Sequence, residues 1–404
     1  MQILYLARWF PFPADNGAKL RTLALLKALA ATHDVALVAF VEAEPTATQL
    51  ADARALCADV TTIPYAHFAP QSRKARLAYF SAQPRSVVST WNPHFAAAVD
   101  DAIVRRKPQV VIAGQIDMVP YAQKVQGIPR VLEELELGLR LAPAAGANRS
   151  LRNALSLWKL GRYVRSFLPD FALVTVVSPG EQALVRKLTP AYKGRMAVVP
   201  NGVSLQPQAV AVPPVPDTLL FPGAVTYSAN LDAVRYFAHE ILPLIQAQRP
   251  TVVLRVTGRT AGVALGDLPQ RVEFTGYLDS VEPLLRASWA EVVPLREGGG
   301  TRLKVLEALA LGTPVVSTTK GADGLDLTPG RDLLLADDPA HFAAETLRLL
   351  GDPALRATLA ENGRAAVARY DWAQIGPRFT ALVEAVALGT RADTLNAPLR
   401  KVTA

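Results

Sequence analysis

The sequence predicts an α/β fold made of two Rossmann-like domains, and three observations carry this prediction. Short, nearly uninterrupted apolar runs such as 3–7, 35–40 and 110–113 alternate with helical patterns, which is typical of parallel strands covered on both faces. An uncharged segment with four prolines, 204–216, interrupts the alternation. The alternation then restarts, and each later apolar run ends in a glycine or a short loop, where open α/β sheets bind their ligands.

Both halves of the chain show the same order of expected elements. The strand at 3–7 leads into a loop with two prolines and an Asn-Gly pair, and a helix with leucines on or near one face follows at about 18–30. The other expected strands are the apolar runs at 35–40, 110–113, 130–132 and 173–177 in the first half and at 219–221, 252–257, 272–274, 291–294 and 314–317 in the second.

The proline-rich segment also sets the expected domain boundaries. We expect an N-terminal domain over 1–205, a linker over 206–216, a second domain over 217–375 and a last helix with tail over 376–404. Two such domains joined by a linker are expected to face each other across a central cleft.

Composition and cysteine use restrict the class of protein. Half of the 404 residues are hydrophobic and 19% are charged, which is a globular composition. No apolar run approaches the roughly 20 residues of a spanning helix, and residues 1–7 read as a strand and not as a signal peptide. The single cysteine, Cys57, excludes an intramolecular disulfide, and the five histidines show no metal-ligand spacing. We expect a cytoplasmic protein, with membrane association left open.

The positive charge is concentrated in the first half. Residues 1–205 hold 24 Lys and Arg against 14 Asp and Glu, whereas 206–404 hold 19 against 21. One basic cluster lies at 73–76, and another lies on a predicted amphipathic helix at 151–168. An anionic membrane surface or an acidic substrate fits these clusters, and solvated helix faces are the alternative. A nucleic acid fits poorly, because aromatic residues are 7% of the chain and no nucleic-acid-binding motif occurs.

The strongest local motif lies at 294–317, where a strand enters a triple-glycine loop and leaves into a helix. Glycines let the backbone approach a phosphate, and a helix N-terminus attracts an anion. Arg302 and Lys304 stand where a first helical turn normally prefers acids, which indicates a bound diphosphate. Glu307, further along the same helix, is placed to accept hydrogen bonds from a ribose diol. The alternative is a flexible loop followed by an ordinary Lys–Glu helix pair.

This motif resembles the donor-binding signature of the GT-B glycosyltransferases of family 4, the glycosyl transferases group 1. The segments 176–178 with 198–203, 272–277, and 335–339 with 370–372 resemble other parts of that family, and so does the opening at 7–17. The resemblance implies the GT-B fold, with a C-terminal helix that crosses back to the N-terminal domain. It further implies a retaining transfer from a nucleotide diphosphate sugar, without a cofactor or an obligatory metal. A glycan, a lipid-linked molecule or a small molecule is the implied acceptor, and cell-surface polysaccharide or glycoconjugate synthesis is the implied process.

The resemblance also implies donor-binding residues. Glu307 matches the second glutamate of the family's E-x7-E motif, whereas Gly299 stands where the first is expected. Glu297 is the candidate substitute for that carboxylate, and a solvated loop glutamate is the alternative. We expect the diphosphate at Arg302 and Lys304. The remaining expected donor contacts are Gly17, Gly223, Arg259, Tyr277, Gly300 and Thr301, together with the backbone of Gly299.

The polar group near the donor sugar is expected among the acids that follow the strand at 130–132. The family often has a histidine there, and this chain has none. Glu136 is the first candidate and Glu133 the second, against the alternative of a solvated acidic patch. Arg21 is either an acceptor contact or, as we expect, a solvated helix arginine. A sugar-nucleotide epimerase of the same fold and a non-catalytic nucleotide-sugar or membrane-binding protein are the rival functions.

Overall fold

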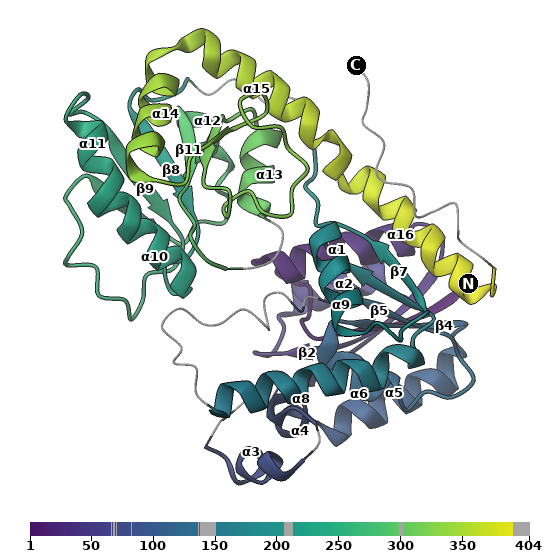
Figure 1. The fold of residues 1–404 in the computed structure, drawn as a ribbon. Helices are drawn as coiled ribbons and strands as arrows, with labels where there is room; N and C mark the ends of the chain where they lie inside the picture. Colours follow the sequence, from purple (N-terminus) through teal and green to yellow (C-terminus); the bar gives the residue numbers. More distant parts are fainter. Residues whose placement is uncertain are drawn as a thin grey trace. The chain divides into compact units, whose positions relative to one another are not determined.

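The computed structural model describes residues 1–65, 67, 69, 71–81, 83–135, 137, 151–205, 213–298 and 302–390. Contacts divide the chain into two compact units, and we describe each by itself (Figure 1). Of the described residues, unit 1 comprises Met1–Pro200 and 373–390, and unit 2 comprises Asn201–Trp372. Most of the expected linker, 206–212, lies outside the described residues. Within the described part of the chain, no helix combines the length and the apolar character needed to cross a bilayer.

Unit 1 contains a sheet of seven parallel strands in the order β3-β2-β1-β4-β5-β6-β7. Its strands are β1 (Gln2–Ala7), β2 (Asp34–Val41), β3 (Asp59–Pro64), β4 (Val110–Gly114), β5 (Arg130–Glu133), β6 (Leu173–Val176) and β7 (Arg195–Val198). Its helices are α1 (Gly17–Ala30), α2 (Ala47–Leu56), α3 (Arg73–Leu77), α4 (Arg85–Thr90), α5 (Pro93–Arg106), α6 (Val119–Ala122), α8 (Leu151–Phe167), α9 (Pro179–Leu188) and α16 (Trp372–Ala387), with 3-10 turns η1 (Ala78–Phe80), η2 (Ile116–Met118) and η3 (Leu168–Asp170).

Both faces of this sheet are buried. Figure 1 shows α5 and α8 on one side of it and α1 and α16 on the other. In β1, Leu4 and Leu6 belong to the apolar cluster that includes Phe95 of α5 and Phe167 of α8. Ile3 and Tyr5 are buried as well, and alternate side chains of a strand point to opposite faces. This two-sided burial explains why the strands read as nearly continuous apolar runs.

Unit 2 contains a parallel sheet of six strands in the order β10-β9-β8-β11-β12-β13. Its strands are β8 (Thr218–Pro222), β9 (Val253–Thr257), β10 (Val272–Gly276), β11 (Ala290–Val293), β12 (Val315–Ser317) and β13 (Leu334–Leu335). Its helices are α10 (Ser228–Tyr236), the π-helix η4 (Phe237–Ile241), α11 (Leu242–Gln246), α12 (Glu282–Ala287), α13 (Leu303–Ala310), α14 (Pro339–Gly351) and α15 (Pro353–Val367), with the 3-10 turn η5 (Ala368–Tyr370).

Each sheet repeats the Rossmann strand order, in which the third, second and first strands precede the fourth. The strand order reverses between β1 and β4 in unit 1 and between β8 and β11 in unit 2. Ligands of such sheets bind at the carboxyl ends of the strands beside this switch point. The α/β fold with two parallel Rossmann-like sheets is therefore confirmed, and it marks one edge of each unit as a candidate site.

Helix α16 packs against α1 within unit 1. A Cβ built on Gly376 would lie 2.7 Å from the Cβ of Ala28, so only glycine permits this approach. Glu384, two turns further along α16, lies 3.0 Å from the ring of His33. The buried side chains Ile375, Phe379 and Val383 line the same helix. The last helix is thus part of the core of unit 1.

We expect Gly376→Ala to lower the free energy of unfolding of unit 1 by about 1–3 kcal/mol, because the added methyl overpacks the α1–α16 contact. The gain in helix propensity, about 1 kcal/mol at most, does not offset this strain. Thermal and urea unfolding of the full chain measure the change. Adding Ala28→Gly to this variant relieves the clash and restores part of the loss.

Gly351→Ala at the end of α14 is the matched control, because nothing lies within 4 Å of the added Cβ. We expect it to leave the stability unchanged or to raise it by less than about 1 kcal/mol. Equal losses in Gly376→Ala and Gly351→Ala would contradict the close packing of α16 on α1.

Candidate functional site

The switch point of unit 2 holds a half-buried lysine, Lys304. The Lys304 ammonium lies 3.3 Å from Asn230 Oδ1 and 3.8 Å from the centroid of the Phe221 ring. A Cβ at Gly223, directly after β8, would lie 3.0 Å from this ammonium and 2.8 Å from the Asn230 side-chain nitrogen. Position 223 must therefore be glycine for the lysine to reach the end of β8. The structure brings together two of the expected donor residues, Gly223 and Lys304.

Arg302 caps the same helix. It directly precedes α13, is 7% exposed, and donates a hydrogen bond from Nη2 to the carbonyl of Gly298 at 3.0 Å. The first turn of α13 contains no acid. Two cations and the positive end of the helix dipole thus lie at one helix N-terminus, which favours an anion there.

Burial shifts the protonation of this cluster. It lowers the pKa of Lys304 to about 8, an effect that nearby Glu291 partly offsets. Burial also raises the pKa of Glu307 to about 7, against the pull of Lys304. Among the described residues, none forms a hydrogen bond with the Glu307 carboxyl. An ammonium and a carboxyl that both titrate near neutral pH are typical of functional sites.

Glu291 is a member of this cluster that the sequence analysis missed. It lies in β11, is fully buried, and neither of its carboxyl oxygens has a hydrogen-bond partner among the described residues. Burial raises the pKa of Glu291 well above its usual range, with Lys304 acting in the opposite direction and Glu307 in the same one. Burial therefore favours the neutral form of this carboxyl. A single acid inside the apolar run at 290–293 is the signal that would have found it.

Arg259 and Tyr277, both expected as donor contacts, lie together at the ends of β9 and β10. The Arg259 guanidinium lies 5.5 Å from the centroid of the Tyr277 ring, and the ring side chain is half exposed. The amide of Gly258 donates to the carbonyl of Gly276 at 2.8 Å, which joins the carboxyl ends of the two parallel strands. An exposed ring beside a cation presents a surface on which a planar base can stack.

The glycine loop itself is only partly described. Glu297 is partly exposed at its start. Gly299, Gly300 and Thr301 lie outside the described residues, and so does Glu136 in unit 1. The roles expected for these four positions stay predictions.

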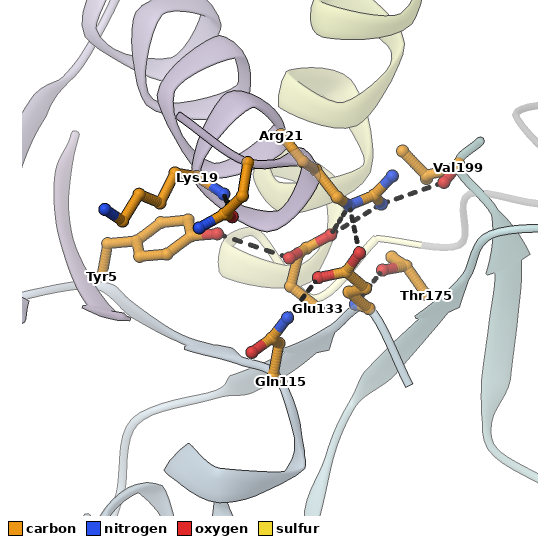
Figure 2. Close-up of polar contacts among 9 residues, drawn as sticks. Tyr5, Lys19, Arg21, Gln115, Glu133, Thr175 and Val199 are labelled. Carbon is orange, nitrogen blue, oxygen red and sulfur yellow. Dashed lines mark hydrogen bonds and ion pairs between the residues drawn. The ribbon is translucent and has the colours of Figure 1, made fainter. Parts of the chain in front are cut away.

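A buried ion cluster occupies the equivalent edge of unit 1 (Figure 2). Arg21 donates from Nε to Glu133 at 2.7 Å and from Nη2 to the carbonyl of Val199 at 2.9 Å. Its Nη2 also lies 2.6 Å from Glu133, and Tyr5 donates to the other Glu133 oxygen at 3.4 Å. Arg21 and Glu133 are each 1% exposed, so the expectation of a solvated Arg21 was wrong. The reason is that Glu133, at the end of β5, supplies a buried counter-charge.

Burial alone would lower the pKa of Arg21, but the carboxylates of Glu133 and Glu134 raise it above its usual range. Burial raises the pKa of Tyr5 well above 10, and Glu133 adds to this effect. The arginine is therefore cationic and the phenol neutral. In this arrangement Glu133 fixes the position of Arg21. Glu133 is therefore suited to a positioning role and not to acting as a base that contacts a substrate.

Two strained residues adjoin this cluster. Gln115 follows β4 with φ 69°, and Glu134 follows β5 with φ 57°. Their side chains meet, because Gln115 Nε2 donates to Glu134 Oε2 at 2.8 Å, and the Thr175 hydroxyl accepts from the Glu134 amide at 3.0 Å. Left-handed conformations of residues other than glycine concentrate at functional sites. Glu134 thus joins Glu133 as an acid that the structure places at this edge, and no sequence pattern signals its backbone conformation.

Gly17, the expected phosphate contact of the first domain, is the first residue of α1. Asn16 precedes it and accepts a hydrogen bond from the amide of Lys19 at 3.0 Å, which caps the helix. The Lys19 ammonium pairs with Asp15 at 2.8 Å. Over the described ranges, no group of three or more His, Cys, Asp or Glu side chains is arranged to hold a metal ion.

Two parallel Rossmann-like sheets of this kind make up the GT-B fold. Residues 216–352, most of unit 2, match the family model of the glycosyl transferases group 1. This finding confirms the resemblance that the sequence motifs carry. Solved structures of similar fold include sucrose-phosphate synthase of Thermosynechococcus elongatus, with a TM-score of 0.68 and 19% identity over 96% of this chain and 100% of that one. HepE of Anabaena, in complex with UDP and glucose, has a TM-score of 0.64 and 16% identity over 95% and 100%.

Two curated relatives are similar in sequence to part of the chain. One is a GDP-mannose-dependent monoacylated alpha-(1-6)-phosphatidylinositol monomannoside mannosyltransferase of Corynebacterium glutamicum, 30% identical over 35% of this chain and 42% of the relative. The other is a phosphatidyl-myo-inositol mannosyltransferase of Mycolicibacterium smegmatis, 29% identical over 46% of this chain and 51% of the relative. The matches thus span about half the length of these relatives.

Removal of Arg21 tests the ion cluster of unit 1. We expect Arg21→Ala to destabilise the protein by about 3–5 kcal/mol, because it leaves Glu133 and Glu134 buried without their cation. Unfolding curves of the wild type and the variant measure the loss. Arg105→Ala, which removes an exposed pair with Asp59 and Asp101, serves as control and has a much smaller effect.

Glu307 gives a prediction on pH. Its pKa is raised in the folded state, so the native protein holds a proton that the unfolded chain releases between about pH 4.5 and 7. The proton on Glu307 stabilises the folded state fully below pH 4.5. This contribution to the free energy of unfolding is lost as the pH rises to 7 and above, and the total loss is about 3 kcal/mol. Glu307→Gln removes this loss, so the variant gains on the wild type across that window. Glu345→Gln on the surface of α14 is the control, and a parallel gain there contradicts the assignment.

Proposed function

We propose that this protein is a retaining glycosyltransferase that moves a sugar from a nucleoside diphosphate sugar to an acceptor hydroxyl. The observation that carries the proposal is the Lys304 ammonium, held beneath Gly223 at the switch point of unit 2 and next to Arg302 at the start of α13. A leaving diphosphate gains negative charge as the glycosidic bond breaks. Cations fixed in advance at that place stabilise the transition state more than the ground state.

The donor is proposed to lie along the carboxyl edge of unit 2. Its diphosphate would contact Arg302, Lys304 and the amides at the start of α13. The Glu307 carboxyl, which has no hydrogen-bond partner among the described residues, would accept from the ribose hydroxyls. The base would stack near Tyr277 and Arg259 at the ends of β9 and β10. No metal is required in this scheme, because the two side-chain cations neutralise the leaving group.

Unit 1 is proposed to supply the acceptor side. Glu134 carries a strained backbone at the carboxyl edge of the sheet, and Gln115 and Arg21 fix its side chain. We propose it as the polar group nearest the reacting sugar, with Glu133 as a positioning residue and Glu136 still a candidate. The family's retaining chemistry passes the acceptor proton toward a phosphate oxygen of the leaving group, so a strong protein base is not needed.

The names of the relatives support a proposal for the nucleobase of the donor and for the kind of acceptor. One curated relative is named as GDP-mannose-dependent, and the solved HepE structure holds UDP and glucose. Two relatives are named as phosphatidylinositol-type mannosyltransferases. We propose a GDP- or UDP-sugar as donor and a lipid-linked acceptor ahead of a soluble one.

A thermal-shift panel with GDP, UDP, ADP and the corresponding sugar nucleotides tests the donor site. A ligand that binds only the folded state adds about 2.7 kcal/mol to the free energy of unfolding at one hundred times Kd, and so raises the unfolding temperature. We expect GDP or UDP to stabilise the protein and ADP to fail. Incubation of the stabilising sugar nucleotide with and without a lipid acceptor then separates transfer from epimerisation, because an epimerase converts the donor without an acceptor.

Lys304→Met tests the proposed phosphate contact. The methionine keeps the apolar stem over Phe221 and removes the charge, so we expect nucleoside diphosphate binding to weaken by about 10- to 100-fold, as for the loss of a hydrogen bond to a charged group. Isothermal titration calorimetry measures the affinity. Arg348→Ala, an exposed arginine on α14 that pairs with Glu345, is the control and keeps wild-type affinity. Unchanged affinity in Lys304→Met would end the assignment.

A further inference from the structure

Large apolar side chains are exposed together on one side of unit 1. Phe80 is 92% exposed and Leu77 66% exposed in the short elements η1 and α3. Trp158, at 54%, and Leu155, at 45%, are exposed on α8. We call these four residues the apolar tips. Isolated exposed apolar residues are normal in proteins, but a group of them on adjoining elements marks an interaction site.

Specific contacts hold these elements together. The Lys159 ammonium of α8 donates to the carbonyl of Tyr79 in η1. The Arg85 guanidinium of α4 donates to the carbonyl of Ala75 in α3 and to the Tyr79 hydroxyl, both at 2.8 Å. Figure 1 shows α3 and α4 beside α8. The apolar tips therefore belong to one fixed block.

The core of the fold does not explain the tips on α8. Tyr163, Val164 and Phe167, in the last turns of α8, are buried in unit 1 and anchor the helix. Leu155 and Trp158, one turn apart, point away from that core and lie on one helix face. The earlier part of α8 thus presents apolar surface for which the described residues provide no cover.

The two segments that carry the apolar tips hold charges of a single sign. Residues 60–99 and 137–169 contain no Asp or Glu at all. Within them, four Lys or Arg residues lie at 71–90 and four more at 151–168. Arg73 and Arg76 are exposed beside Leu77, and Arg162 is exposed with its guanidinium 5.7 Å from the Trp158 ring. A protein partner usually meets a mixture of charges, whereas an anionic bilayer matches apolar tips ringed by cations only.

We propose that α3, η1 and the first half of α8 form a docking surface for anionic lipid bilayers. The apolar tips would enter the boundary between headgroups and acyl chains, and Arg73, Arg76 and Arg162 would contact lipid phosphates. The protein would lie on the membrane without crossing it. This inference does not depend on the transfer reaction, although it would bring a lipid-linked acceptor within reach.

Co-sedimentation of the full chain with vesicles tests the proposal. We expect binding to vesicles of phosphatidylcholine mixed with phosphatidylglycerol, little binding to phosphatidylcholine alone, and release at high salt, since each cation near the surface contributes about fivefold to the affinity. The double variant Phe80→Asp, Trp158→Asp loses at least about tenfold in affinity, because it removes two inserting side chains. Arg73→Gln with Arg76→Gln weakens binding and reduces its dependence on salt.

Val104→Asp on α5 is the matched control, since Val104 is an equally exposed apolar residue, 73% exposed, outside the docking surface. It keeps wild-type vesicle binding, and all variants keep the wild-type unfolding temperature. The proposal is overturned if the wild type stays in the supernatant with anionic vesicles, or if Val104→Asp loses as much as the double variant. It is also overturned if the tips prove to mediate self-association, so that the double variant changes the oligomeric state but not vesicle binding. A failure of nucleotides to bind in the thermal-shift panel would not change the results expected for vesicle binding.

Discussion

The contact between Arg21 and Glu133 fixes the candidate edge of unit 1. It joins α1 to the end of β5, and Tyr5 and the carbonyl of Val199 complete it (Figure 2). A buried pair of this kind adds little net stability, because desolvation offsets the attraction. It does penalise every arrangement in which one partner is left alone. Its effect is therefore on geometry: α1 cannot shift along the sheet without exposing a bare charge to the apolar interior.

The ion cluster of unit 2 differs from that of unit 1, because its cation has no carboxylate partner that is fully ionised. Lys304 is enclosed by Phe221 and Asn230, and its carboxylate neighbours Glu291 and Glu307 are themselves disfavoured as anions by burial. The lysine is thus a cation without a fully ionised partner. A bound dianion would supply the missing negative charge and raise the pKa of Lys304. It would also neutralise the charge of Arg302. The cluster is organised before the ligand arrives, which is the condition for strong electrostatic stabilisation in a dry site.

The central strands were readable from sequence, because apolar runs are a local pattern. The expected strands at 35–40 and 130–132 lie within β2 and β5. No strand was expected at β3, β7 or β13, which are three of the four sheet edges. Edge strands are less apolar or shorter, as the Asp-Val-Thr-Thr-Ile-Pro run of β3 shows. Contacts between distant positions were equally invisible, since Arg21 and Glu133 are 112 residues apart and the strain at Glu134 leaves no mark in the sequence.

The two halves of the chain differ in net charge, so an anionic surface attracts the first half and not the second. Residues 1–205 carry ten more basic than acidic residues, and 206–404 carry two more acidic than basic ones. The segments 71–90 and 151–168, which hold the apolar tips, contain eight of the basic residues and no acid. The excess of positive charge is therefore concentrated where apolar side chains are also exposed. Folding explains neither feature, because exposed apolar groups and repelling like charges both oppose it. An anionic bilayer removes both penalties at once, since its headgroups neutralise the arginines and its acyl region accepts the tips.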